Sequence, residues 1–306
     1  MAVSEEIRAL IDATPFVDTH EHLFEESKRI KALEGANADP LPVAAPDIGL
    51  LFSHYSDSDL ESAGMNPAAT QRLFSYDVEP CEKWKMIEPY YRSAYHTGYL
   101  QSVRESVRAL YGEDDLTARN VDAISERIRA RIKPGFYGPI LREAANLEHA
   151  QINNLDAPIF METEQPNLLC QDMNIKVLST DLDVKTVSGM ANREVTDLKD
   201  WHEIIDWCFA TYGPRAIAIK STAAYRRRLD YAQVGADDAA PLFKRYLKDK
   251  DNLYKPEYKP LQDHLFNYCV RKAIEYNLPL KLHTGYYAHS GRMPLQQGQA
   301  QRRRPL

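Results

Sequence analysis

The chain has 306 residues, 44% of them hydrophobic, which is enough for one large globular domain or two ordinary ones. Its 38 basic and 44 acidic residues give a formal charge of -6, which argues against a nucleic-acid-binding surface. No apolar run approaches the length of a membrane helix, the four cysteines form no CxxC pair, and the acidic N-terminus does not resemble a signal peptide. We therefore expect a cytoplasmic protein with reduced thiols and no membrane partner.

The N-terminal segment predicts a helix followed by a strand. Residues 4–13 (SEEIRALIDA) have helical spacing, begin with serine and carry early glutamates. Pro15 then favours an extended approach to the apolar run FVDTH at 16–20. From residue 24 to 134, aromatic and charged residues recur at helical spacing with almost no strand signal, which predicts a helical insertion after the first strand.

Four further strand-like runs follow the insertion, each close to an amphipathic helix. The runs are HAQIN at 149–153, KVLSTDL at 176–182, AIAIKS at 216–221 and LPLKLHTG at 278–285. Helical patterns occupy 198–213 and 261–277. Strands that are apolar on both faces and alternate with helices are typical of parallel β/α units, so we expect an α/β fold with five strands in total.

The number of strands bears on the architecture. A closed (β/α)8 TIM-type barrel needs eight strands, and this chain has used most of its length by the fifth. Residues 291–306 are rich in Gln and Arg, poor in aliphatic residues, and lack a strand or helix pattern. We expect a truncated or frame-shifted barrel over residues 1–290 and an irregular basic tail over 291–306; the alternative is an open five-stranded α/β fold with a tail.

Candidate metal ligands lie at the ends of three predicted strands. His20 and His22 follow the first strand, and on an extended chain both imidazoles point to one side, where they can chelate a divalent cation such as zinc. Lys220 ends the run AIAIK, and His283 follows LPLKL before a Thr-Gly break. Barrel enzymes build their active sites at the carboxyl ends of the strands, so this convergence is stronger evidence than any single motif. Asp18 points to the same side as the histidines and could orient an imidazole.

These segments resemble the amidohydrolase superfamily. The stretches FVDTHEHL at 16–23, AIAIKSTAAYRRRLDY at 216–231 and LPLKLHTGYY at 278–287 carry the resemblance. It is closest to the amidohydrolase-related branch that includes the domain fused to glutamine-synthetase-like proteins, with uronate isomerases as distant kin.

The resemblance implies roles for the strand-end residues. His20 and His22 would be metal ligands of the first strand, and His283 would be the histidine of the fifth strand. Lys220 would occupy the position that is a carboxylated, metal-bridging lysine in some members and does not bridge in others, so one or two metals, most often zinc, are expected. In such a site Lys220 and His283 would also take part in catalysis. The family pattern further expects a strand-six histidine and a strand-eight aspartate, and the sequence offers neither in the right place.

Four other residues are candidates for substrate binding. Tyr225 and Arg226 follow Lys220, where a guanidinium could bind a substrate carboxylate, although the RRR run could equally be a solvated cluster. Arg92 lies in the insertion that commonly caps the site in such enzymes, and its alternative is a surface or helix-pairing role. His54 could reach the pocket, but an isolated histidine in a helical region is usually structural.

The resulting expectation is a metal-dependent hydrolase that cleaves a C–N or C–O bond of an amide- or lactone-type small molecule with a metal-activated water. Uronate isomerase-like or decarboxylase chemistry on the same scaffold is one alternative. A catalytically inactive, truncated barrel is the other, because an incomplete barrel leaves strand edges unpaired. Assembly as a homo-oligomer stays open.

Overall fold

The computed structural model describes most of the chain and divides it into two compact units. The described residues are 4–34, 43–153, 156–249 and 256–284. Within them, the helical unit comprises residues 4–16 and 24–148, and the sheet unit comprises residues 17–23 and 149–284. The predicted tail at 291–306 lies outside the described residues.

The helical unit is built from short helices around its own apolar core. Its helices are α1 (Glu5–Ala13), α2 (Glu26–Leu33), η1 (Ile48–Phe52), α3 (Ser56–Ser62), α4 (Pro67–Leu73), α5 (Pro80–Ser93), α6 (Gly98–Tyr111), α7 (Val121–Arg131) and the π-helical turn η2 (Gly138–Ala144). The predicted first helix is confirmed, and the Ser4 side chain caps it by accepting a hydrogen bond from the backbone N–H of Ile7. A buried ion pair joins Lys83 to Asp47 at 2.6 Å inside this unit.

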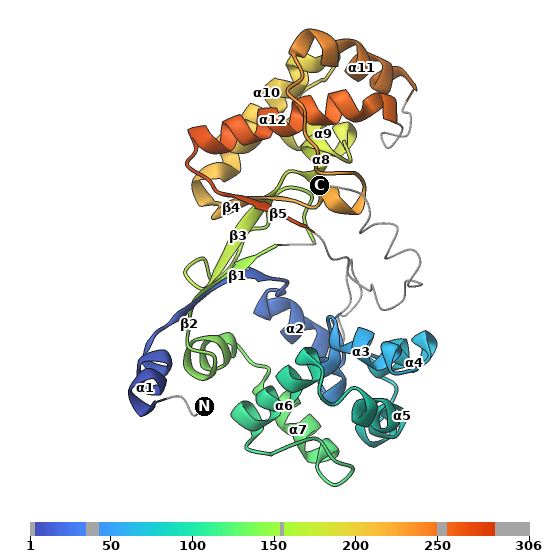
Figure 1. Ribbon diagram of the computed structural model, residues 1–306, viewed down its shortest axis with the longest axis vertical. Helices are drawn as coiled ribbons and strands as arrows, with labels where there is room; N and C mark the ends of the chain where they lie inside the picture. Colours follow the sequence, from blue (N-terminus) through green and yellow to red (C-terminus); the bar gives the residue numbers. More distant parts are fainter. Residues whose placement is uncertain (1–3, 35–42, 154–155, 250–255, 285–306) are drawn as a thin grey trace. The chain divides into compact units, whose positions relative to one another are not determined.

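The sheet unit contains a curled parallel sheet of five strands in chain order (Figure 1). The strands are β1 (Phe16–Glu21), β2 (Leu147–Ile152), β3 (Leu169–Asn174), β4 (Ala218–Ser221) and β5 (Leu280–Leu282). The pairings β2–β3, β3–β4 and β4–β5 are all parallel. This arrangement is compatible with part of a TIM-like barrel, because neighbouring strands in sequence are neighbours in the sheet.

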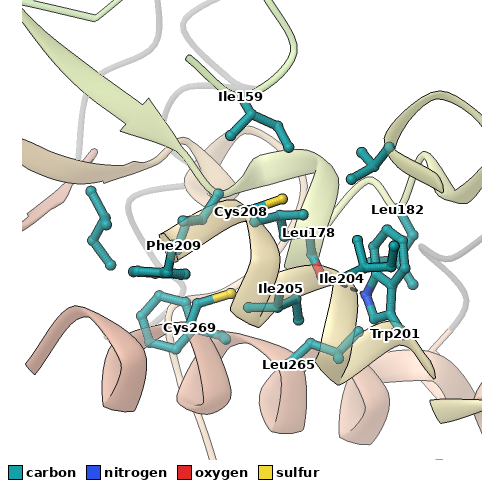
Figure 2. Packing of buried hydrophobic residues seen from close by; sticks show 14 of the residues in the cluster. Ile159, Leu178, Leu182, Trp201, Ile204, Ile205, Cys208, Phe209, Leu265 and Cys269 are labelled. Atoms are coloured by element: carbon teal, nitrogen blue, oxygen red, sulfur yellow. Dashed lines mark hydrogen bonds between the residues drawn. The ribbon is translucent and has the colours of Figure 1, made fainter. Parts of the chain in front are cut away.

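Helices cover one side of strands β3 to β5 (Figure 1). They are α8 (Lys176–Ser179), α9 (Val184–Ala191), α10 (Leu198–Tyr212), η3 (Gly213–Arg215), η4 (Ala223–Tyr225), α11 (Ala236–Asp249), η5 (Pro256–Tyr258) and α12 (Lys259–Glu275). Figure 2 shows the buried cluster between them, in which the Trp201 indole donates a hydrogen bond to the Leu178 carbonyl at 3.1 Å. Burial of such side chains stabilises the unit by roughly 1.5–3 kcal/mol each.

The predicted third strand was wrong in position. Residues 176–179 form helix α8, and the strand lies earlier, over Leu169–Asn174. The segment LCQDMN has only two strongly apolar members beyond its cysteine, Leu169 and Met173, so it does not look like an apolar run. Ile175 and Leu178 are both fully buried and are three residues apart, so they lie on the same side of the helical turn, which packs against the core.

The strands are also not apolar on both faces, contrary to expectation. Met173 of β3 pairs in register with Ile219 of β4, and both are fully buried in the core beneath the helices. Because side chains alternate along a strand, the residues next to them point to the opposite face. That face carries Asp172, Lys220 and Lys281, so it is polar.

Helix α12 holds the loop that follows β4. The Asp263 carboxylate accepts hydrogen bonds from the Arg227 guanidinium, from Lys259 at 2.7 Å and from the backbone N–H of Ala232 at 3.2 Å. The Arg227 and Asp263 side chains are 8% and 2% exposed, so water does not replace these contacts. The loop carrying Tyr225 is therefore fixed from the helix side.

The sequence also predicts reduced thiols and no membrane-spanning helix. None of the four cysteines, all of which lie within the described residues, forms a disulfide, and Cys208 and Cys269 are buried. Within the described residues, no helix is both long and apolar enough to cross a bilayer.

We predict that Asp263→Ala lowers the free energy of unfolding of the sheet unit by about 3–5 kcal/mol, because it leaves the Arg227 guanidinium buried without its carboxylate. Urea unfolding followed by circular dichroism measures the change. The control is Asp230→Ala: Asp230 also lies near Arg227, at 3.8 Å, but is 44% exposed, and its loss should cost less than about 1 kcal/mol. Equal effects of the two substitutions would contradict the anchoring role of Asp263.

Candidate functional site

Three of the four predicted metal ligands lie together on the polar face of the sheet. His20 lies in β1 and His22 directly follows its last residue; their ring centroids are 4.8 Å apart and the ring planes are nearly perpendicular. The Lys220 amine at the end of β4 donates a hydrogen bond to His20 Nδ1 at 3.3 Å. Strands β1 and β4 are not neighbours in the sheet, so its curl brings their residues within reach of each other.

One hydrogen bond holds the His22 ring, and another holds the main chain at His20. The Asn153 carbonyl accepts a hydrogen bond from His22 Nδ1 at 2.8 Å, so Nε2 of His22 is the ring nitrogen that carries the lone pair when the ring is neutral. The Asp18 carboxylate accepts from the backbone N–H of His20 at 3.0 Å. Asp18 thus orients the main chain at His20, whereas the sequence suggested a contact with an imidazole.

A buried ion pair, not anticipated from the sequence, crosses the same face. The Lys281 amine on β5 donates to Asp172 Oδ1 on β3 at 2.7 Å, and the Asp172 side chain is only 1% exposed. Strand β4 lies between them, and the residue level with Asp172 is Ala218, whose small side chain leaves room for the lysine to cross. Lys220 is the register partner of Lys281, so two lysines and an aspartate stand beside the histidines.

Burial shifts the pKa values of the nitrogen groups of His20 and Lys220. Burial, with the nearby Lys220, His22, Lys281 and His283, lowers the pKa of His20 to about 4. Burial also lowers the pKa of Lys220, against the opposing charge of Asp172. The His20 ring is therefore neutral near pH 7, and the shift at Lys220 is in the direction of the uncharged amine.

The two carboxyl groups nearby shift the other way. Burial raises the pKa of Asp172 to about 6, although its bond to Lys281 and the charge of Lys220 oppose the rise. Burial and the neighbouring Asp18 raise the pKa of Glu21 to about 7. Side chains alternate along an extended chain, so Glu21 points to the opposite face from His20 and His22. Carboxyl groups with shifted pKa values concentrate at functional sites, so Asp172 and Glu21 are both candidate site residues.

The fourth predicted ligand, His283, lies at the end of β5 against Tyr225. Their ring centroids are 4.7 Å apart, and the backbone N–H of His283 donates to the Ser221 carbonyl at 3.0 Å. Arg226 forms an ion pair with Asp181 at 3.7 Å and is half exposed. Tyr225 is thus placed beside a candidate ligand, while the guanidinium of Arg226 is near a carboxylate of the chain itself.

The two candidates in the insertion belong to the helical unit. Arg92 pairs with Glu88 one turn earlier on α5, and its side chain is 76% exposed. Arg92 is thus an exposed residue that pairs with a carboxylate of its own helix. His54 has a positive φ of 58° and packs edge-to-face with Tyr55 at 5.4 Å.

The site contains fewer conventional ligands than a complete metal centre. Within the part of the chain that the structure describes, no group of three or more His, Cys, Asp or Glu side chains is arranged to hold a metal ion. The described residues bring His20 and His22 together as a pair, with the Lys220 amine beside His20. No protein-family model matches the chain, and no curated protein matches it.

We predict that Lys281→Met lowers the free energy of unfolding by about 2–4 kcal/mol, because it leaves the Asp172 carboxyl group buried without its cation. Adding Asp172→Asn to that variant should recover part of the loss, since the unpaired charge is removed. Chemical unfolding of both single variants and the double variant gives the coupling energy.

The control for this cycle is Lys199→Met. Lys199 is 83% exposed and lies as far as 4.0 Å from its carboxylate partner, so we expect its free energy of unfolding to change by less than about 0.5 kcal/mol. If the two single-variant losses at 172 and 281 were simply additive, the ion pair would not be the interaction that stabilises this face.

Proposed function

We propose that the chain is a metal-dependent hydrolase of the amidohydrolase type, acting on a C–N or C–O bond of an amide or lactone in a small molecule. The observation that carries the proposal is the meeting of His20, His22 and Lys220 on the polar face of a parallel sheet. Catalytic groups of barrel enzymes cluster at strand ends in this way. The proposal includes a TIM-type barrel as the architecture to which the five strands belong.

The nitrogen atoms fit a divalent cation such as zinc. Two nitrogens bound to one tetrahedral zinc ion at about 2.0–2.1 Å are about 3.3 Å apart, which matches the 3.3 Å between His20 Nδ1 and Lys220 Nζ. His22 is held by the Asn153 carbonyl through Nδ1, the kind of outer hydrogen bond that metal-binding histidines usually make. A catalytic ion needs only a small number of protein ligands, because its other positions are kept for water and substrate.

Lys220 can serve such a site in either of two forms. As a neutral amine it is a nitrogen donor, and as a carbamate formed with carbon dioxide it offers two oxygen atoms. Both forms require the uncharged amine, which burial favours. The second form would support two ions and the first only one.

A bound divalent cation supplies a water of lowered pKa and polarises a carbonyl oxygen. The side chains around it have separate tasks. Lys281, oriented by Asp172, directs a positive charge to the same face and favours a substrate with a carbonyl or carboxylate oxygen. Tyr225 packs on His283 and limits the motion of that ring. Asp172, with its pKa raised to about 6, can hold or release a proton near neutral pH.

We predict that the purified chain, loaded with zinc, hydrolyses a member of a panel of amides and lactones, and that a chelator abolishes the activity. The variant His20→Ala/His22→Ala should lose both the bound zinc and the activity, because it removes the two imidazole ligands. Metal analysis after gel filtration and the hydrolysis assay measure these two properties together.

The control is His96→Ala, which removes an exposed histidine of the helical unit and should change neither property. Uronates and aromatic acids complete the panel, because turnover of these compounds alone would replace hydrolysis by isomerase or decarboxylase chemistry. Zinc bound equally well by the double variant would refute the site.

A further inference from the structure

A second pair of histidines lies among the helices of the sheet unit, on different elements from the strand-end site. His202 on α10 and His264 on α12 face each other through their Nε2 atoms, which are 2.9 Å apart. The ring centroids are 5.1 Å apart. Neither residue was singled out by the sequence, because an isolated histidine within an amphipathic helix gives no motif.

Both rings are held in place by contacts on their other sides. The Val234 carbonyl accepts a hydrogen bond from His264 Nδ1 at 2.8 Å, so the lone pair of the neutral ring is on Nε2, which faces His202. The His202 ring stacks on Tyr268 with a centroid distance of 4.1 Å and an interplanar angle of 2°. The Tyr268 hydroxyl in turn donates to Asp206 at 3.0 Å.

The two rings differ in exposure. His264 is 4% exposed and His202 is partly exposed, so the His202 side of the pair is the side nearer to solvent. Burial and the neighbouring His264 lower the pKa of His202 to about 4, so its ring is neutral near pH 7.

The separation of the two Nε2 atoms is that of a hydrogen bond, and it also equals the spacing of two adjacent ligands on some metal ions. Two imidazole nitrogens bound at about 2.0–2.1 Å in adjacent positions of a square or octahedral ion are about 2.9 Å apart, whereas tetrahedral positions are about 3.3 Å apart. The observed 2.9 Å corresponds to the first arrangement. The outer bond from His264 to a backbone carbonyl is also the support that metal-binding histidines usually have.

We propose that His202 and His264 form a second divalent-metal site, for a late first-row cation of tetragonal geometry such as Ni²⁺ or Cu²⁺, which cross-links α10 to α12. Water completes the coordination. For the ion to bind, the proton that the neutral His202 ring carries on Nε2 moves to Nδ1 of the same ring by exchange with water, which leaves a lone pair on both Nε2 atoms. By joining two helices that cover the sheet, it stabilises the folded sheet unit.

The test is carried out in the full chain with His20→Ala and His22→Ala, so that the strand-end site cannot contribute. In this background, increasing Ni²⁺ should raise the midpoint of thermal unfolding by several degrees. Adding His202→Gln should abolish the rise, and adding His96→Gln should leave it intact. His202→Gln is preferred to a change at His264, because His264 also anchors the loop at Val234.

Electron paramagnetic resonance of bound Cu²⁺ provides a readout that does not depend on stability. The spectrum should show coupling to two imidazole nitrogens, and it should lose that coupling in the His202→Gln variant. A Ni²⁺-dependent rise that survives His202→Gln, or the absence of any rise, would overturn the proposal and leave a hydrogen-bonded histidine pair. Either result is independent of the proposed hydrolase activity, because the strand-end histidines are absent from the background.

Discussion

The alternation of side chains along parallel strands is the constraint on which the sheet unit depends. Met173 and Ile219 are register partners and point into the core beneath the helices. The residues that alternate with them must then point to the opposite face, whatever their chemistry. Asp172 and Lys220 occupy that face. One pattern of alternation therefore produces both the apolar core and the polar surface on which the candidate site is built.

Burial of polar groups on this face is costly unless they are paired. The crossing of Lys281 over Ala218 to Asp172 provides one pairing, and the contact of Lys220 with His20 provides another. Replacing such a pair by apolar residues of similar volume is often neutral or stabilising, so stability alone is weak grounds for keeping it.

Sequence reasoning located much of this architecture because its strongest signals are local. The serine-capped first helix and the strand ends carrying His20 and Lys220 follow from spacing, capping and apolar runs. The third strand was missed because Cys170, Gln171 and Asp172 interrupt its apolar pattern. Its partners in the sheet, not its own composition, determine that it is a strand.

The missed strand also explains which site residues were missed. Asp172 could not be considered because its segment was not predicted as a strand. Lys281 was read as part of an apolar run, although the alternation in LPLKLH already places it on the side opposite to Leu280 and Leu282. The pair His202 and His264 is separated by 62 positions, and only the packing of α10 against α12 joins them. Contacts of this kind depend on tertiary structure and have no signature in one sequence.

The most direct test of the account is X-ray absorption at the zinc edge, on the His202→Gln chain loaded with one equivalent of zinc. The account predicts nitrogen and oxygen ligands at about 2.0–2.1 Å with outer scattering from two imidazoles, and loss of that scattering when His20 and His22 are replaced by alanine. Sulfur ligands at about 2.3 Å, or an unchanged spectrum in the alanine variant, would contradict the assignment of the polar face as a metal site.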